Sequence, residues 1–338
     1  MWDSPTFLPG QGVGTLRFPV ALGPMPRSLP SEPSPDAAPP MGVPRLTQAR
    51  APLTQAIEAV NEYGDVETVS IPAERALTVY VDKRELVTLM TLGAQPELLV
   101  LGYLRNQRLV QSVFDIDSIT VDWEVGAAAV KTRSGIDQIE ERTARRVVTT
   151  GCGQGSVFGD LMADIDTLVL PPATLSQAQL YGIVNAIRLQ ESTYKSAGSV
   201  HGCALFQGQD MLVFVEDVGR HNAIDTIAGW MWMQDAAQTT DALRMQGTDK
   251  VFYTTGRLTS EMVIKSAQMG VPIVVSRSGI TQMGHAVAQQ LGLCAIGRAT
   301  NRHFVCYSGR DRLLLQPELA GPRRTPVEPV PASTSSKP

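Results

Sequence analysis

Residues 250–296 read KVFYTTGRLTSEMVIKSAQMGVPIVVSRSGITQMGHAVAQQLGLCAI, and this stretch decides the fold. Apolar runs of strand length alternate in it with longer segments whose apolar residues recur at helical spacing. This alternation indicates a largely parallel sheet covered by helices on both faces. The predicted strands are 250–254, 272–276 and 293–296, and the predicted helices are 259–269 and 281–291.

The same rhythm extends toward the N-terminus as far as residue 176. Residues 176–190 and 222–234 have helical spacing, and Ser176 is a plausible N-cap of the first of these helices. Residues 204–206 and 211–216 are apolar runs separated by Gly208, which indicates two strands. We therefore predict one α/β domain over residues 176–312.

The segment before this domain has a different pattern. Residues 61–146 contain alternating apolar runs around Pro72 and an apolar-faced helix after Pro96, which together predict a small α+β domain. Residues 147–175 are predicted to be a mobile, cysteine-bearing loop and linker. The proline-rich ends, residues 1–60 and 313–338, are predicted to be disordered because they have little apolar surface to bury.

Composition excludes several classes of protein. The chain has 338 residues, 43% hydrophobic content and a net charge of −4, so a general nucleic-acid-binding surface is not expected. No apolar run reaches the roughly 20 residues of a membrane span, and the N-terminus does not have the pattern of a signal peptide. Four cysteines, no two within four residues of each other, argue against a zinc ribbon or a disulfide framework and favour a reducing cytoplasm.

Cys152 is the best candidate nucleophile. It lies in Thr150-Gly151-Cys152-Gly153-Gln154-Gly155, where the glycines leave the thiol open to attack. Arg145 and Arg146 lie just upstream and would lower the pKa of the thiol if they fold near it. The alternative is an incidental cysteine in a turn. We expect structural roles for the other three cysteines, Cys203, Cys294 and Cys306.

Three polar clusters follow predicted strands, where open α/β sheets place ligand sites. The first, residues 216–223, contains Arg220 and His221, and the second, residues 254–261, contains Arg257 at a helix start that favours an anion. The third, residues 297–303, carries two arginines and a histidine and is a candidate seat for a phosphorylated ligand. Each cluster also has an ordinary explanation, as a capped helix start or a solvated loop. The sequence contains no Walker A motif, no G-x-G-x-x-G after a strand and no G-x-S-x-G.

Taken together, the clusters resemble the FdhD family of formate dehydrogenase accessory sulfurtransferases. The resemblance covers about residues 66–308. It is carried by residues 150–153 (TGCG), 200–206 (VHGCALF), 216–223 (EDVGRHNA), and Gly256-Arg257 with Ser260-Glu261. These motifs occur in the family's order, and their combination is specific.

The resemblance implies a function. The family takes sulfur from a cysteine desulfurase as a persulfide on the loop cysteine, which corresponds to Cys152. It passes the sulfur to a molybdenum cofactor with two molybdopterin guanine dinucleotides, destined for formate dehydrogenase. The segment that contacts this cofactor corresponds to Arg298, Ala299, Thr300, Asn301, Arg302 and His303. The resemblance also implies a homodimer, no permanent metal, and a three-layer α/β/α domain like that of cytidine deaminases, preceded by the smaller α+β domain.

The chain departs from the family's Cys-x-x-Cys-Gly loop, because Gly155 stands where the second cysteine is expected. A Cys152 persulfide therefore has no thiol three residues away, although sulfur transfer needs only one nucleophilic sulfur at a time. A second hypothesis, a zinc deaminase, is strongly disfavoured, because such an enzyme needs H-x-E and P-C-x-x-C, whereas this chain has His201-Gly202-Cys203 and no P-C-x-x-C. The alternative that stays open is a cofactor chaperone without catalysis. A non-catalytic cofactor chaperone would need the basic residues 298–303 but not Cys152.

Overall fold

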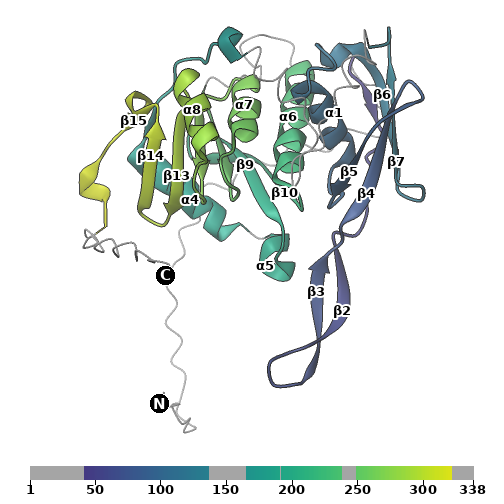
Figure 1. The fold of residues 1–338 in the computed structure, drawn as a ribbon, viewed down its shortest axis with the longest axis horizontal. Helices are drawn as coiled ribbons and strands as arrows, with labels where there is room; N and C mark the ends of the chain where they lie inside the picture. Colours follow the sequence, from purple (N-terminus) through teal and green to yellow (C-terminus); the bar gives the residue numbers. More distant parts are fainter. Residues whose placement is uncertain (1–41, 137–164, 191, 238–248, 322–338) are drawn as a thin grey trace, which may run out of the picture. The chain divides into compact units, whose positions relative to one another are not determined.

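The computed structural model describes residues 42–136, 165–190, 192–237 and 249–321, which all lie in one compact unit, Pro39–Pro338 (Figure 1). Two sheets dominate it. The central sheet has six strands in the order β10-β9-β11-β12-β13-β14, and a five-stranded sheet has the order β1-β6-β7-β4-β5. The fold is therefore a mixed α/β arrangement.

The central sheet contains the strands that the sequence predicts. It consists of β9 (His201–Gln207), β10 (Asp210–Asp217), β11 (Lys250–Thr254), β12 (Ile273–Ser276), β13 (Cys294–Thr300) and β14 (His303–Ser308). The prediction of a largely parallel sheet is wrong, because only β11, β12 and β13 run parallel. β9, β10 and β14 are antiparallel to their neighbours. Short connections explain the difference at β10 and β14, because each hairpin turn reverses the chain.

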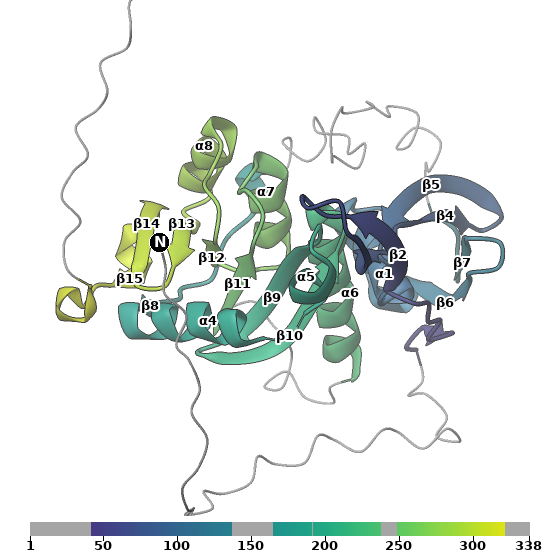
Figure 2. The ribbon, with the colours of Figure 1, turned by 90° about the horizontal axis from the view of Figure 1, so that it is seen from below.

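Helices cover both faces of this sheet, as predicted. α6 (Arg220–Ala237), α7 (Ser260–Gln268) and α8 (Gln282–Gln290) bury their apolar sides against one face. α4 (Gln177–Leu189) covers the opposite face, and Figure 2 shows it across the sheet from α7 and α8. Ser176 caps α4 as the sequence predicts, because its side chain accepts from the backbone N of Gln179.

The five-stranded sheet forms the other half of the unit. β4 (Arg75–Val81), β5 (Arg84–Thr91), β6 (Ile116–Asp122) and β7 (Ala127–Thr132) carry its apolar core. α1 (Pro96–Asn106) packs against this core on one side and against α6 on the other. A short 3-10 turn, Val113–Asp115, leads into β6.

α1 and α6 cross so closely that each needs a glycine at the crossing. A Cβ at Gly102 would lie 1.6 Å from the carbonyl O of Asp225, and one at Gly229 would lie 2.1 Å from the carbonyl O of Leu98. Neither position therefore has room for a side chain. This contact joins the two predicted domains into a single compact unit.

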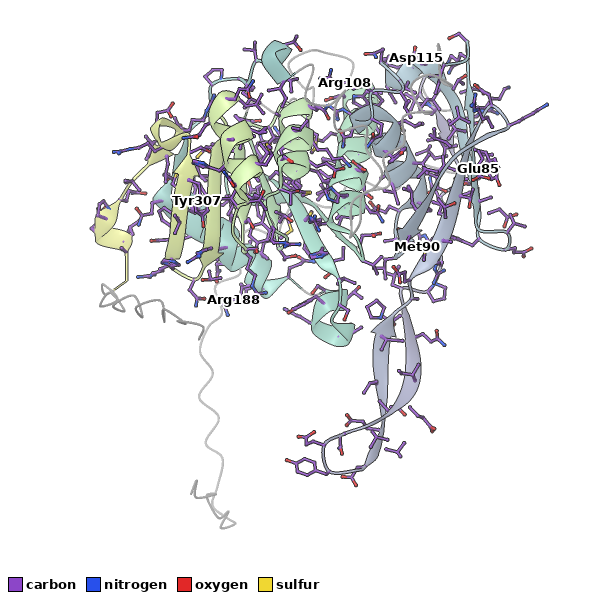
Figure 3. All side chains as sticks on the ribbon, in the orientation of Figure 1. Glu85, Met90, Arg108, Asp115, Arg188 and Tyr307 are labelled. Carbon is purple, nitrogen blue, oxygen red and sulfur yellow. The ribbon has the colours of Figure 1, made fainter. Side chains whose placement is uncertain are left out.

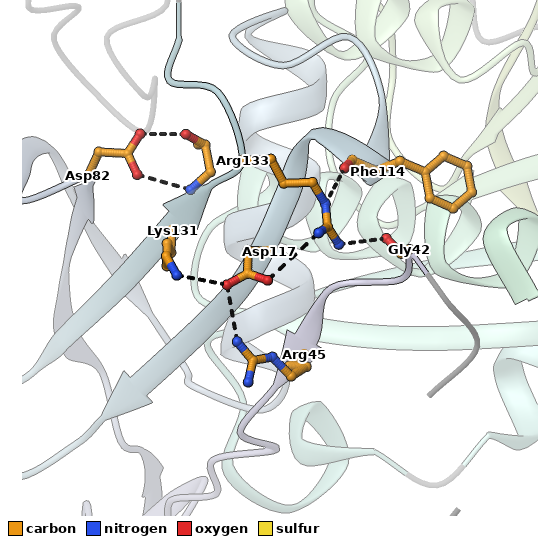
Figure 4. Close-up of polar contacts among 8 residues, drawn as sticks. Gly42, Arg45, Asp82, Phe114, Asp117, Lys131 and Arg133 are labelled. Carbon is orange, nitrogen blue, oxygen red and sulfur yellow. Dashed lines mark hydrogen bonds and ion pairs between the residues drawn. The ribbon is translucent and has the colours of Figure 1, made fainter. Parts of the chain in front are cut away.

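The prediction that residues 1–60 are disordered is wrong for the part that the structure describes. This part contains β1 (Arg45–Leu46), which pairs with β6, and β2 (Thr54–Val60). Figure 4 shows Arg45 joined to Asp117, which also binds the side chains of Lys131 and Arg133. Backbone pairing and ion pairs hold this segment, and an argument from apolar content does not detect them.

The predicted C-terminal tail, 313–338, also begins with ordered residues. β15 (Leu313–Leu314) pairs in parallel with β8 (Leu175–Ser176), which spans the predicted boundary between the linker 147–175 and the α/β domain. The backbone N of Ala178 donates to Oε1 of Gln316 at 3.0 Å. Contacts with β8 and the start of α4 therefore order residues 313–316, which the sequence predicts to be part of a disordered tail.

Among the described residues, the strand β2 pairs only with β3 (Val66–Pro72), and the hairpin projects from the rest of the fold (Figure 1). Several of its large apolar side chains are exposed, with 68% of Val60, 81% of Tyr63 and 66% of Val66 accessible to solvent. An isolated two-stranded hairpin is marginally stable in water. We call residues 54–72 the hairpin arm.

Candidate functional site

The three polar clusters lie at the same end of the strands of the central sheet, because the parallel and antiparallel pairings bring these strand ends to one side. The end of β10 lies beside the start of β9, with Asp217 opposite His201. The end of β11 lies beside the end of β12, with Thr254 opposite Ser276. The end of β13 meets the start of β14 at the same edge, with Thr300 opposite His303. We call this end of the strands the polar edge, as distinct from the outermost strands of the sheet, β10 and β14.

Asp217 ties the five-stranded sheet to the polar edge. Its carboxylate accepts hydrogen bonds from Thr91 Oγ1, from the backbone N of Leu92 and Gly219, and from Asn222 Nδ2. The side chain is 3% exposed, and burial raises the pKa of Asp217 against the opposing effect of these bonds. Asn222 Nδ2 also donates at 2.7 Å to the carbonyl O of Met90, which Figure 3 labels near the end of β5. The predicted cluster 216–223 thus has a structural part that fastens two sheets.

Glu216, next to Asp217, also has a structural role. Its two carboxylate oxygens accept from the backbone N of Thr193 and of Tyr194 at the start of the short helix α5 (Thr193–Ala197). A cavity of about 410 Å³ opens beside Glu216, lined in part by Leu92 and Phe214. Glu216 and Asp217, the last two residues of β10, therefore hold the start of α5 and the end of β5 against this strand.

Cationic groups gather beside this anchor. Arg220 is the first residue of α6 and is 7% exposed. The pKa of His201 is lowered by burial first and then by the charges of Arg220 and Arg257, which places both arginines near this imidazole. A Cβ at Gly256 would lie 3.0 Å from Cδ of Arg220, so the glycine leaves room for the arginine stem. Arg257 itself is exposed.

Two polar atoms of this group are buried without a hydrogen-bond partner among the described residues. They are Nε of Arg220 and Nδ1 of His221. Buried polar groups are almost always hydrogen-bonded in folded proteins. A donor and a ring nitrogen in this condition, at the N-terminal end of a long helix, are typical of a site that receives an anionic or hydrogen-bonding ligand.

His221 leads into a buried chain of charges. Its Nε2 lies 3.5 Å from Oε2 of Glu261, whose Oε1 lies 3.4 Å from Nζ of Lys265. The Lys265 ammonium binds the Asp225 carboxylate at 2.9 Å, and both side chains are fully buried. Burial, followed by the nearby charge of Lys265, lowers the pKa of His221 to about 3. The imidazole is therefore neutral at physiological pH.

The loops after β11 and β12 are bound to one another. Thr254 Oγ1 accepts from Sγ of Cys203 at 3.3 Å and from the backbone N of Gly256 at 3.0 Å. Ser276 Oγ donates to the carbonyl O of Gly256 at 2.7 Å and accepts from the backbone N of Ser278. The backbone beside Arg257 is therefore set before any ligand arrives. Cys203 is fully buried, and burial raises the pKa of its thiol to about 12, which agrees with the predicted structural role.

The basic segment 297–303 is part of a hairpin rather than a loop after a strand ending at 296. β13 continues to Thr300 and β14 begins at His303, so Asn301 and Arg302 form the turn. Arg298, Thr300, Asn301, Arg302 and His303 are exposed, whereas the side chain of Ala299 is 1% exposed and packs in the core beneath α4. Only the backbone of Ala299 is therefore left to face a ligand. The carbonyl O of Arg302 accepts from the hydroxyl of Tyr181 on α4 at 3.1 Å.

The predicted nucleophile, Cys152, lies outside the described residues, so its role stays a prediction. Within the described ranges no group of three or more His, Cys, Asp or Glu side chains could hold a metal ion. No helix of the described residues is long and apolar enough to cross a membrane.

Sequence reasoning found Arg220, His221 and Arg257 but missed the residues that support them. Lys265 and Asp225 lie on helices that were predicted, and a charged residue on the apolar face of each predicted helix was the available signal. Asn106, whose Nδ2 donates at 2.7 Å to Asp225 Oδ1, lies on α1 and carries no such signal. Only the fold brings it to this chain of charges.

Fold and site together define a class: a mixed α/β protein with a cationic, partly buried site at the ends of its central strands. The chain belongs to the FdhD/NarQ family, whose model matches residues 72–314. It is 27% identical to the sulfur carrier protein FdhD of Geobacillus kaustophilus, over 74% of this chain and 92% of that protein. It is also 27% identical to the sulfur carrier protein FdhD of Bacillus subtilis, over 75% of this chain and 94% of that protein.

A solved structure shows the same fold. The crystal structure of a protein assigned as a formate dehydrogenase accessory protein, from Desulfotalea psychrophila, aligns with a TM-score of 0.60 at 22% identity. The alignment covers 78% of this chain and 100% of that one. The family resemblance predicted from the motifs is confirmed.

Proposed function

We propose that this chain is a sulfur carrier that supports formate dehydrogenase, with Cys152 as its persulfide-forming nucleophile. Family membership over residues 72–314 carries the proposal, together with relatives named sulfur carrier proteins. In the first step, the Cys152 thiolate attacks the outer sulfur of a persulfide on a cysteine desulfurase. The new S–S bond forms on Cys152 as the desulfurase cysteine leaves as a thiolate, so electrons and atoms balance.

The proposed acceptor is a molybdenum cofactor with two molybdopterin guanine dinucleotides, bound as substrate at the polar edge. Each dinucleotide brings a pyrophosphate, which arginine side chains bind well. The exposed group Arg298, Thr300, Asn301, Arg302 and His303 would contact it, joined by Arg257 and by the buried Arg220. The partnerless Nε of Arg220 fits this assignment, because an incoming phosphate oxygen would satisfy it.

The residues of the polar edge would bind and orient this substrate. Neutral His221 offers a hydrogen-bonding nitrogen rather than a further positive charge, and its ring lies against Glu261, which Lys265 holds in turn. Asp217 keeps the start of α6 fixed through its bonds to Gly219 and Asn222. Rigid support of this kind raises affinity because the side chains lose little conformational freedom on binding.

Intact mass spectrometry tests the proposed nucleophile. Purified protein would be incubated with a cysteine desulfurase and L-cysteine, beside the variants Cys152→Ala and Cys306→Ser. We expect a gain of one sulfur atom that dithiothreitol reverses in the wild type and in Cys306→Ser, and no gain in Cys152→Ala. No gain in the wild type, with the desulfurase active on another acceptor, would refute the relay.

The same Cys152→Ala variant separates this function from the alternative, a cofactor-binding chaperone without sulfur chemistry. In cells that lack their own copy of the carrier, a chaperone would still activate formate dehydrogenase when Cys152 is replaced. A sulfur carrier would not. The exposed basic group formed by residues 298 and 300–303 favours either function over deamination, since Cys203, where a deaminase needs a glutamate, is buried in the core.

We further propose that the chain forms a homodimer through the hairpin arm. The arm has no sheet partner among the described residues, and it exposes Ile57, Val60, Val66 and Ile71. Burying such side chains between two copies would stabilise an element that is marginal alone. Light scattering on Val60→Lys/Val66→Lys should show a monomer, with Glu58→Lys as the control that stays dimeric. A double variant with unchanged mass would rule the arm out.

The proposed setting is a reducing cytoplasm, in keeping with free thiols at Cys203, Cys294 and Cys306. We also propose that the domain around the central sheet is related to the cytidine deaminase fold. Helices on both faces of the mixed sheet support this relationship.

A further inference from the structure

Two thiols meet across the last two strands of the central sheet. Cys294 begins β13 and Cys306 lies on β14, and the side chain of each shifts the pKa of the other. The Cys306 thiol also donates to the carbonyl O of Ser308 at 3.3 Å. Both pack in the apolar core beneath α4, so they lie on the same face of the sheet. The sequence separates them by twelve residues, and only the antiparallel register of this hairpin brings them together.

A local irregularity tightens this contact. Cys306 lies opposite Ile296 and Ser308 opposite Ala295, so Tyr307 (labelled in Figure 3) is the extra residue of a β-bulge. Just beyond it, Gly309 has a positive φ of 63°, and a Cβ at Gly309 would lie 2.7 Å from Cα of Cys294. The chain of β14 therefore lies close against Cys294 where the two thiols meet. β14 is an edge strand with one neighbour, so it has freedom to adjust as a bond forms.

The two thiols are chemically unequal. Cys294 is fully buried, whereas Cys306 is partly exposed on the edge strand. The hydrogen bond from Cys294 lowers the pKa of Cys306 to about 7 and raises that of Cys294, and the charge of Arg310 adds to the effect on Cys306. Cys306 is the thiol that a dissolved oxidant can reach, and the buried Cys294 is placed to act second.

We propose that Cys294 and Cys306 form a redox-active dithiol site, which a small-molecule disulfide such as oxidised glutathione converts into a cross-strand disulfide. The Cys306 thiolate attacks one sulfur of oxidised glutathione, forms a mixed disulfide and releases one glutathione thiolate. Cys294 loses its proton, attacks Cys306 Sγ and releases the second glutathione. The two protein thiols are oxidised by two electrons, and one glutathione disulfide is reduced to two thiols.

This site is independent of the proposed sulfur relay. It uses neither Cys152 nor the cationic residues of the polar edge, and it revises the structural roles predicted from sequence for Cys294 and Cys306. Bridging requires Cβ atoms about 3.5–4.5 Å apart, and two side chains that share one face of neighbouring strands beside a bulge reach this spacing through a shift of the edge strand. Cys203 offers the internal comparison, because it is fully buried and its Sγ donates to a hydroxyl rather than to a thiol.

The test is peptide mapping of the full chain in its native state. The Cys152→Ser protein and the wild type would be incubated with oxidised glutathione, alkylated, unfolded and digested with trypsin, which cuts at Arg298 and Arg302 between the two cysteines. We expect a linked Cys294–Cys306 peptide in both proteins, lost on reduction, while Cys203 stays a free thiol. Cys294→Ala should instead trap glutathione on Cys306, and Cys306→Ser should show neither product.

Two outcomes would overturn the proposal. One is glutathione that stays on Cys306 in the wild type although Cys294 is present. The other is an unmodified Cys306 in native protein, with an exposed-cysteine peptide in the same tube showing that the oxidant is active. Because Cys294 is buried, a thermal melt of Cys294→Ala checks that this variant folds, and Cys306→Ser on the edge strand gives an independent result.

Discussion

The two halves of the polar edge differ sharply in how they are built. At the ends of β9, β10 and β11, Asp217, Arg220 and His221 are all buried. Hydrogen bonds hold Asp217, and His221 lies against the carboxylate of Glu261. At the β13–β14 turn, Arg298 and Arg302 are exposed. One half is fixed by the fold before any ligand arrives, whereas the other keeps side-chain freedom that binding must remove.

This difference separates stability from affinity. Removing a buried charge leaves its partners unpaired in a low-dielectric interior, so the free energy of unfolding should fall. Removing an exposed charge costs the fold little, so the loss should appear only when an anionic ligand is bound. Three measurements test this division, beginning with the largest expected effect.

Lys265→Met should destabilise the protein most. The change leaves Asp225 fully buried without its cation, and breaking a buried ion pair by removing one partner costs about 3–5 kcal/mol. Urea unfolding at neutral pH measures the loss, and the double variant Lys265→Met/Asp225→Leu should recover part of it. Lys131→Met is the matched control, because its pair with Asp117 is exposed and should matter little. Equal losses from both single variants would contradict the comparison.

The pH dependence of stability should report on His221. Its pKa falls from about 6.5 in the unfolded chain to about 3 in the fold, so protons bind preferentially to the unfolded state. Its contribution is therefore complete above pH 6.5 and is lost as the pH falls from there toward 3, by about 1.4 kcal/mol for each pH unit. His201, whose pKa is also lowered, acts in the same direction. Urea midpoints of His221→Gln should fall less steeply across this window, and an unchanged slope would count against the buried, neutral imidazole.

Arg302→Ala should have the smallest effect on folding and a clear effect on binding. The free energy of unfolding should change by less than about 0.5 kcal/mol, as is usual for an exposed residue. Affinity for guanosine diphosphate, measured by calorimetry, should fall by about tenfold if one charge-assisted bond to a phosphate is lost. Arg84→Ala, exposed at the start of β5, is the control that should bind as the wild type does. Equal affinity in all three proteins would remove the β13–β14 turn from the proposed site.

Local sequence patterns were reliable wherever neighbouring residues decide the structure. The strand 250–254 and the Ser176 cap agree with the structure residue for residue. The predicted helices 259–269 and 281–291 differ from α7 and α8 by only one residue at each end. In each case apolar spacing or a side-chain cap acts over a few residues, so it can be read without knowing the fold.

The errors arose where distant segments meet. Residues 45–60 and 313–319 have compositions typical of flexible ends, yet pairing with β6 and β8 orders parts of both. The pairing of these short strands is a long-range property, and composition carries little information about it. β14 is a different case: it was not predicted as a strand, because the basic residues around its tight turn at Asn301 and Arg302 were assigned to a loop.

By itself, the sequence determined the family, the alternation of strands and helices in its second half, and the residue types of the site. Motifs and periodicity are local, so they survive without coordinates. Only the tertiary structure decided that Asp217 joins two sheets, that Lys265 and Asp225 form a buried pair behind His221, and that Cys294 and Cys306 share one face of the β13–β14 hairpin. The first two contacts join segments far apart in the chain, and the third depends on strand register. The energy of all three depends on burial that packing alone creates.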